Sequence, residues 1–218
     1  RVRRLQGWAI DEVLAVARRR GEGPLVEAAL LARKGAVSEA LQVAGLVDRP
    51  AAIRQLAGGW LAKGKREQVK SLLAQSADAS SQAPLKAWID HLDGRTEVGV
   101  KSLRSYLYEH GTDLLAYVVL ARIHAQQGEL RLARLACKEG LKQGASADLH
   151  YMLGRVEAQR GKKVASRRAM EAALVVQPAH LGAHSAMARS QLEQLDYAGA
   201  LKHTTVAYRL APGDPEIA

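Results

Sequence analysis

Three arginines recur at nearly constant spacing in the second half of the sequence, and their side chains are suited to binding anions. Arg122, Arg155 and Arg189 stand 33 and 34 residues apart. A guanidinium group presents a planar fork of donors that binds a carboxylate bidentately. Such spacing predicts a row of guanidinium groups that accepts an acidic segment, extended or helical. The alternative interpretation is that these arginines pair with Glu157 and Glu193 and only keep the surface soluble.

Two histidines have a spacing that could bind a metal ion. His180 and His184 are four residues apart, which places both on one face of a helix. Pro178, however, puts His180 at the entrance of that helix, and no Cys, Asp or Glu nearby completes a ligand set. The sequence therefore predicts packing or a polar bond for these histidines, and no metal site.

No residue pattern supports an enzyme. Cys137 is the only cysteine, which excludes a disulfide, a thiolate zinc site and an iron–sulfur cluster within the chain, and its position predicts a small buried side chain. There is no phosphate-binding loop, dinucleotide fingerprint or paired-carboxylate site. We expect no catalytic residue, no cofactor and no small-molecule substrate.

The composition indicates an all-α protein. Hydrophobic residues make up 48% of the 218 residues, yet only 4% are aromatic and Phe is absent. Ala and Leu, the strongest helix formers, carry most of the burial. Clusters of β-branched and aromatic residues between turns, which would indicate strands, are scarce.

The positive charge is spread along the chain. The formal charge of +10 divides into +4 for residues 1–20, +2 for residues 21–112 and +4 for residues 113–218. Arg1, Arg3, Arg4 and Arg18–Arg20 could attract nucleic acid or anionic lipid, but a solvated helix flank is the favoured interpretation. The remainder of the sequence, residues 21–218, lacks a continuous basic stripe. A nucleic acid is therefore a less favoured partner than a polypeptide.

Three consecutive segments repeat the same pattern, with starts 33 and 34 residues apart at Leu114, Ala147 and Leu181. Each segment holds a small residue where two helices would cross, and Gly128 and Gly161 occupy the turn between them, with Leu195 in that slot of the third. Small residues let helices approach closely, glycine closes the first helix, and proline stops the second. The small residues are Ala121, Gly154 and Ala188, then Ala133, Ser166 and Ala200, then Gly140, Ala173 and Ala207.

This pattern resembles the tetratricopeptide repeat family across about half of the chain. The resemblance rests on the residues above together with Tyr117, Leu120, Leu130, Leu153, Met170, Pro178, Met187, Tyr197 and Pro212. It implies a right-handed α-solenoid of stacked antiparallel helix pairs with about six repeats, in which neighbours must stack to bury their apolar faces.

The first half keeps a weaker form of the same pattern. We expect a lone helix within residues 1–20, degenerate repeats over residues 21–111 (about 24–48, 50–76 and 83–111), and three well-formed repeats over residues 112–218. The polar stretch Gln75–Pro84 predicts a loop. A start at Arg1 and a helix entry after Pro212 suggest a fragment of a longer chain, which can be membrane-anchored elsewhere. No signal peptide or apolar run of 18 residues is visible, and the compartment, cytoplasmic or periplasmic, is left open.

The resemblance also implies where a partner lies. In this family the first helix of each pair lines a concave groove, and the residue after the small one faces it. That slot holds Arg122, Arg155 and Arg189; Val118, Gln126, Tyr151, Gln159, Ser185 and Glu193 occupy other slots on the face, and Trp88 is a candidate anchor from the degenerate part. The dicarboxylate clamp of heat-shock co-chaperones needs Asn, which this sequence lacks.

The predicted function is a non-enzymatic scaffold or adaptor whose groove binds a partner polypeptide, with an acidic segment as the expected ligand. The Ala- and Arg-rich composition suggests a bacterial source and an assembly of the secretion, pilus or polysaccharide-export type. Three alternatives stay open: a chaperone for a disordered, acidic client, a basic α-solenoid that binds nucleic acid, and the regulatory arm of a longer enzyme. The salt dependence of binding separates the nucleic-acid alternative from a peptide groove.

Overall fold

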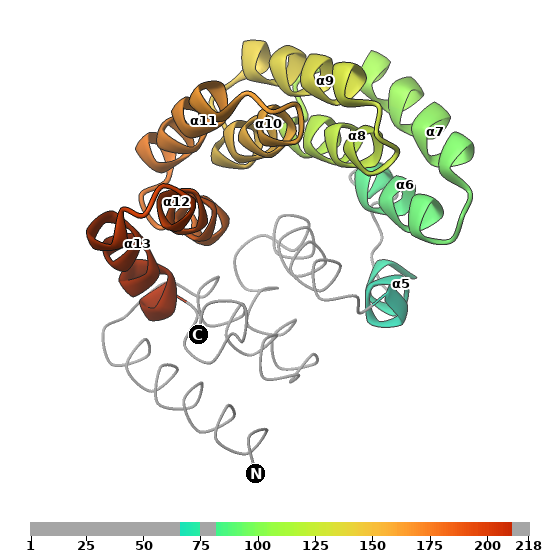
Figure 1. The fold of residues 1–218 in the computed structure, drawn as a ribbon. Coiled ribbons are helices and arrows are strands. Elements are labelled where there is room, and N and C mark those ends of the chain that lie inside the picture. Colours follow the sequence, from blue (N-terminus) through green and yellow to red (C-terminus); the bar gives the residue numbers. More distant parts are fainter. Residues whose placement is uncertain (1–65, 75–81, 211–218) are drawn as a thin grey trace. The chain divides into compact units, whose positions relative to one another are not determined.

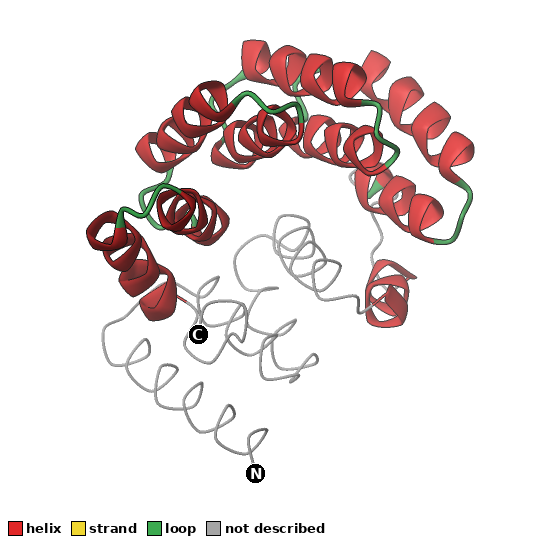
Figure 2. Ribbon diagram, in the orientation of Figure 1, coloured by secondary structure: helices red, strands yellow, loops and turns green. Residues whose placement is uncertain are grey.

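The structure, a computed structural model, describes residues 66–74 and 82–210, and every regular element in these ranges is an α-helix (Figure 2). The all-α fold predicted from composition is confirmed. The expected helix within residues 1–20 and the repeat at 24–48 lie outside the described residues. The helices are α5 (Arg66–Ala74), α6 (Ala83–Leu92), α7 (Thr96–Glu109), α8 (Leu114–Gln126), α9 (Leu130–Gln143), α10 (Ala147–Gln159), α11 (Lys163–Val176), α12 (Leu181–Glu193) and α13 (Tyr197–Leu210).

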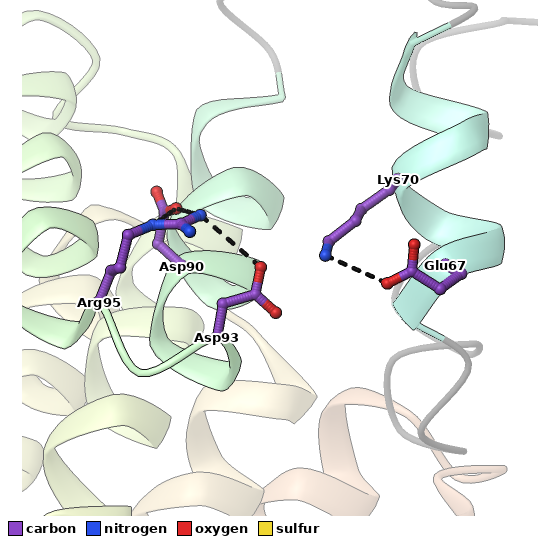
Figure 3. Close-up of polar contacts among 5 residues, drawn as sticks. All are labelled: Glu67, Lys70, Asp90, Asp93 and Arg95. Carbon is purple, nitrogen blue, oxygen red and sulfur yellow. Dashed lines mark hydrogen bonds and ion pairs between the residues drawn. The ribbon is translucent and has the colours of Figure 1, made fainter.

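The chain divides into two compact units, residues 1–89 and residues 90–218. In the first unit, α5 lies within the degenerate repeat expected at 50–76 and buries Val69 and Leu73. An ion pair between Lys70 and Glu67 lies on its surface (Figure 3). The loop is expected to reach Pro84, but α6 begins one residue before it, at Ala83, because proline is tolerated in the first turn of a helix.

In the second unit, helices α8 to α13 form three pairs, α8 with α9, α10 with α11 and α12 with α13. The pairs stack in order, since α9 packs on α10 and α11 packs on α12. Figure 1 shows the first helices of the pairs, α8, α10 and α12, along the inner side of an arc, and the second helices, α9, α11 and α13, along its outer side. The stacked helix pairs predicted from the repeat are confirmed.

The three first helices begin where the spacing predicts, because each has a side-chain cap. Asp113 accepts a hydrogen bond from the Leu115 N–H, and Ser146 accepts one from the Leu149 N–H. The third cap is His180, whose Nδ1 accepts from the Ala183 N–H. Each cap satisfies a backbone donor that the first turn would otherwise leave without a partner.

The turns inside the pairs have the backbone that the glycine pattern implies. Gly128 and Gly161 have φ values of 78° and 73°, in the left-handed region that glycine adopts without steric cost. Leu195, which replaces glycine in the third pair, has φ 61°. The third repeat therefore has the same turn conformation as the other two, and Leu195 adopts a strained left-handed backbone there.

A similar turn joins α6 to α7, around Gly94 with φ 83°. The Arg95 side chain reaches back across it to the carboxylate of Asp90, at 2.5 Å, and lies 3.6 Å from that of Asp93 (Figure 3). This ion-pair cluster ties the turn to the end of α6.

Close approach explains the small residues at the crossings. Ala121 and Ala173 are fully buried, and Gly140 and Gly154 are buried as well. A Cβ added at Gly140 would lie 2.7 Å from Tyr117 and Leu149, and one added at Gly154 would lie 2.7 Å from the methyl carbon of Met170. Packing against Tyr117 therefore favours glycine at Gly140, whereas at Gly154 the flexible Met170 side chain would have to move to admit a larger residue. None of the described helices is long and apolar enough to cross a lipid bilayer.

Candidate functional site

The three recurring arginines occupy the same place in the three first helices, α8, α10 and α12. Each follows the small residue of its helix by one position, and the three helices that carry them lie along the inner side of the second unit (Figure 1). Arg155 and Arg189 are exposed, whereas Arg122 is half-buried. The arginines are therefore not equivalent in their access to solvent.

Six of the predicted groove residues line one open pocket, of about 490 Å³, formed by α10, α11 and α12. Its floor is apolar, and its rim carries four basic side chains and one acidic one. The predicted residues in the pocket are Tyr151, Arg155, Gln159, Ser185, Arg189 and Glu193; the basic residues that the sequence analysis missed are Lys163 and Arg167, both from α11.

Glu157 and Glu193, the two carboxylates expected to pair with the recurring arginines, contact other cations instead. Glu157 is buried and accepts hydrogen bonds from Arg134 at 2.7 Å and from Arg160 at 2.8 Å. Glu193 lies 3.9 Å from Lys163. The alternative in which Glu157 and Glu193 neutralise the row therefore does not match this geometry.

Arg155 and Arg189 form no ion pair within residues 66–74 and 82–210, and Arg167 pairs with Glu171 at 3.7 Å on its own helix. Four basic residues against one acid leave the pocket with a formal charge of +3. Two guanidinium groups in one pocket thus remain without a carboxylate.

Tyr151 fixes the position of Arg155 in the pocket. The guanidinium carbon of Arg155 lies 5.8 Å from the centre of the Tyr151 ring, within the range of a cation–π contact. On the other side the ring lies 5.0 Å from the His180 ring. A Cβ added at Gly182 would lie 2.8 Å from the Tyr151 ring, so glycine there lets the ring pack against α12.

Arg122 is more buried than Arg155 and Arg189. Burial lowers its pKa, the positive charge of Arg155 lowers it further, and Tyr151 and Asp148 act in the opposite direction. The side chain stays protonated at neutral pH, because an arginine pKa starts so high. Arg122 thus carries a positive charge close to that of Arg155.

The histidines stabilise the repeat interfaces. His180 Nε2 lies 3.1 Å from the carboxylate of Asp148 on α10, and this hydrogen bond is the main cause that lowers the pKa of Asp148. His184 contacts the Pro178 carbonyl and His203 Nδ1, both at 2.8 Å. The described part of the chain contains no group of three or more potential metal ligands.

Cys137 is fully buried in α9, where desolvation raises the pKa of its thiol to about 12. It remains a protonated, apolar side chain at neutral pH, as its slot in the repeat predicts.

Two of the predicted groove residues face the interior. Trp88 in α6 is 5% exposed and Val118 in α8 is 9% exposed, so neither presents a surface to a guest chain. Their groove slots follow only from the position of each residue in the repeat. An apolar side chain at such a slot becomes part of the core when neighbouring helices cover it. Gln126 is exposed, but its Oε1 contacts His91 Nε2 at 2.7 Å and lies outside the pocket.

Comparison with solved structures identifies the fold. The chain is similar to TTC0263, a thermophilic TPR protein of Thermus thermophilus, with a TM-score of 0.62 and 18% identity over 77% of this chain and 94% of that one. It is also similar to MamA from Desulfovibrio magneticus (TM-score 0.51, 16% identity, 77% and 98% of the chains). In the Cut9–Hcn1 complex of the APC/C the match covers 97% of this chain and 45% of that chain, with a TM-score of 0.58 and 14% identity.

No protein family model matches the sequence, and no curated protein does either. The structural likeness shows that the chain has the tetratricopeptide-repeat fold, an α-solenoid.

Proposed function

We propose that this chain is a protein-interaction scaffold whose pocket at α10, α11 and α12 binds an acidic segment of a partner polypeptide. The observation that carries the proposal is the pair Arg155 and Arg189, which share the pocket and have no carboxylate partner within the described ranges. A bound carboxylate would supply the missing partner. The repeat fold supports a scaffold role, because a stack of helix pairs offers an extended concave surface.

The pocket also selects for apolar side chains next to the acidic group. Met170, Leu181 and Met187 line it together with the charged rim, and Met170 and Met187 belong to the buried core between α11 and α12. Methionine side chains adapt to the shape of a guest side chain. The expected ligand is therefore a short segment in which Glu or Asp alternates with Leu or another apolar residue.

Electrostatics adds to the specificity of this pocket. Arg155, Lys163, Arg167 and Arg189 all line the pocket, so an anion there is attracted by more than one positive charge. A basic segment would be repelled by the same charges. Within a bacterial secretion, pilus or polysaccharide-export assembly such a segment would belong to another subunit, and that setting stays a prediction.

The test is a comparison of captured partners. The chain and its Arg155→Glu/Arg189→Glu variant are used as baits, beside a control variant, Lys138→Glu/Arg168→Glu. The control changes the charge equally at exposed sites on α9 and α11 outside the pocket. We expect an acidic partner that the control retains and the pocket variant loses.

Retention of every partner by both variants would refute the proposal. Capture of RNA or DNA in place of protein would do the same, and binding that collapses between low and moderate salt identifies that outcome.

A further inference from the structure

Charge is distributed unequally between the inner and the outer helices of the second unit. The inner helices α8, α10 and α12 contain three arginines and three carboxylates, so their formal charges cancel. The outer helices α9, α11 and α13 contain nine lysines and arginines against two glutamates, a formal charge of +7. The excess positive charge of these helices therefore lies along the outer side of the arc (Figure 1).

The outward-facing side chains of the outer helices mix cations with apolar residues. Positions 2, 6, 9 and 13 of each fourteen-residue helix lie opposite positions 4, 7, 8 and 11, which are buried in α9. Leu135 on α9 and Val164 and Val175 on α11 occupy outward positions and are 54%, 58% and 82% exposed. The cations at outward positions are Arg131, Lys138, Lys142, Arg168, Lys202 and Arg209. We call these nine residues the basic outer face.

Most of the cations on the basic outer face have no carboxylate partner. Lys142 contacts Glu139 at 2.7 Å, and Glu171, the one acid at an outward position of these helices, pairs with Arg167. The other five cations are exposed and form no ion pair within residues 66–74 and 82–210. Their charge is therefore available to an external anionic surface.

The exposure of this face on α9 and α11 persists inside the stack. Helix α9 packs on α8 and α10, and α11 packs on α10 and α12, so both have neighbours on either side. Their outward positions stay exposed because these neighbours cover only the opposite side of each helix. The mixture of cations and apolar side chains is thus a property of the assembled repeats.

Such a mixture is suited to the surface of an anionic lipid bilayer. Basic side chains are attracted by lipid phosphates, and apolar side chains enter the boundary between head groups and acyl chains. Leu135, Val164 and Val175 stand among cations and do not line the pocket at α10, α11 and α12. A peptide is usually held in a groove, and a nucleic acid gains nothing from exposed valines, whereas a bilayer contacts both kinds of side chain on an outward-facing surface.

We propose that the basic outer face docks on an anionic lipid bilayer. Its cations contact lipid phosphates, and Leu135, Val164 and Val175 enter the interface between head groups and acyl chains. The basic outer face shares no residue with the pocket at α10, α11 and α12. The inference therefore does not depend on the function proposed for that pocket.

The test is cosedimentation of the intact chain with vesicles of three parts phosphatidylcholine to one part phosphatidylglycerol, and with vesicles of phosphatidylcholine alone. We expect binding to the anionic vesicles only, and binding at least about 10-fold weaker in Lys138→Glu/Arg168→Glu. The matched control, Arg155→Glu/Arg189→Glu, changes the charge equally on the inner helices and should bind within about 2-fold of the unmodified chain. Val164→Ser/Val175→Ser keeps the charge and should bind about 3-fold more weakly.

Circular dichroism verifies that each variant is folded. If Lys138→Glu/Arg168→Glu binds the vesicles as the unmodified chain does, the lipid contact lies elsewhere and the inference is overturned. Equal weakening in both charge-reversed variants would overturn it too, because net charge alone would then attract the vesicles. Absence of vesicle binding also overturns it, and salt-sensitive binding of a duplex oligonucleotide in its place assigns the face to nucleic acid. Full binding by Val164→Ser/Val175→Ser would contradict the insertion of apolar side chains.

Discussion

The Arg155 guanidinium carbon lies 5.8 Å from the centre of the Tyr151 ring, one helical turn earlier in α10. The ring is itself held between this arginine, His180 and the bare backbone of Gly182. The contact orients a charged side chain that has no acidic partner in the described ranges. A site whose cation is already positioned loses less conformational entropy when it binds an anion.

The first prediction concerns this aromatic support. Replacing Tyr151 with Leu removes the ring that positions Arg155, and an acidic peptide should bind about 3-fold more weakly, the equivalent of a modest cation–π contact of ~0.5–1 kcal/mol. Tyr151→Phe keeps the ring and should bind normally. Isothermal titration calorimetry with one acidic peptide measures its dissociation constant for each variant. Equal affinity of the Leu and Phe variants would show that Arg155 needs no aromatic support.

The second prediction concerns Leu195, which has φ 61° in the turn between α12 and α13. Left-handed backbone costs a leucine about 1–2 kcal/mol relative to glycine, although glycine loses part of this gain through greater freedom in the unfolded chain. Leu195→Gly should therefore raise the free energy of unfolding by up to about 1 kcal/mol. Urea denaturation measures the change. A lower stability of Leu195→Gly would mean that the leucine side chain contributes packing that outweighs the backbone strain.

The third prediction concerns Cys137, whose thiol is fully buried and has its pKa raised to about 12. At pH 7.5 hardly any thiolate is present and no reagent reaches the sulfur, so the native chain should not react with a thiol reagent within minutes. The chain in urea should react at once. Rapid labelling of the native chain, followed by absorbance, would indicate that α9 opens from α10 far more readily than this packing allows.

The fourth prediction concerns pH. Burial, aided by the charge of His184, lowers the pKa of His203 below the ordinary value of 6.5. The folded chain therefore favours the neutral imidazole. Above pH 6.5 His203 is neutral in both the folded and the unfolded chain and does not change the free energy of unfolding. As the pH falls through 6.5 toward the lowered pKa, the unfolded chain binds the proton more readily, so stability is lost. His150, whose pKa burial also lowers, acts in the same direction.

We expect the melting temperature to fall between pH 7.5 and pH 5.5, and to fall less in His203→Gln. His110→Gln, at an exposed position, is the control. A pH dependence that His203→Gln leaves unchanged would place the titration elsewhere.

Sequence spacing located the helices of the last three repeats because several local signals agree. Asp113 and Ser146 are ordinary helix caps, and Pro178 forces Gln177 into extended backbone, so α11 ends at Val176. The His180 cap is harder to recognise, since histidine is not a usual cap and its role depends on Asp148 across the repeat interface.

The pocket was harder to predict than the helices. The second helix α11 contributes Lys163 and Arg167 to the rim, and a pattern confined to the first helices cannot include them. Sequence spacing also cannot distinguish the half-buried Arg122 from the exposed Arg155 and Arg189. The burial of each side chain depends on how consecutive repeats stack. Side-chain partners such as Arg134 and Glu157 are 23 residues apart and join only through the fold.

The most direct measurement is the dissociation constant of one fluorescent peptide, twelve residues of alternating Glu and Leu, for three proteins at 150 mM salt. The proteins are the unmodified chain, Arg155→Glu/Arg189→Glu and Lys138→Glu/Arg168→Glu. Losing two charge-assisted contacts should weaken binding at least about 10-fold in the pocket variant, whereas the control should stay within about 2-fold. If the two variants bind the peptide with the same affinity as each other, the pocket at Arg155 and Arg189 is not where it binds; equal weakening of both would show that net charge alone attracts the peptide.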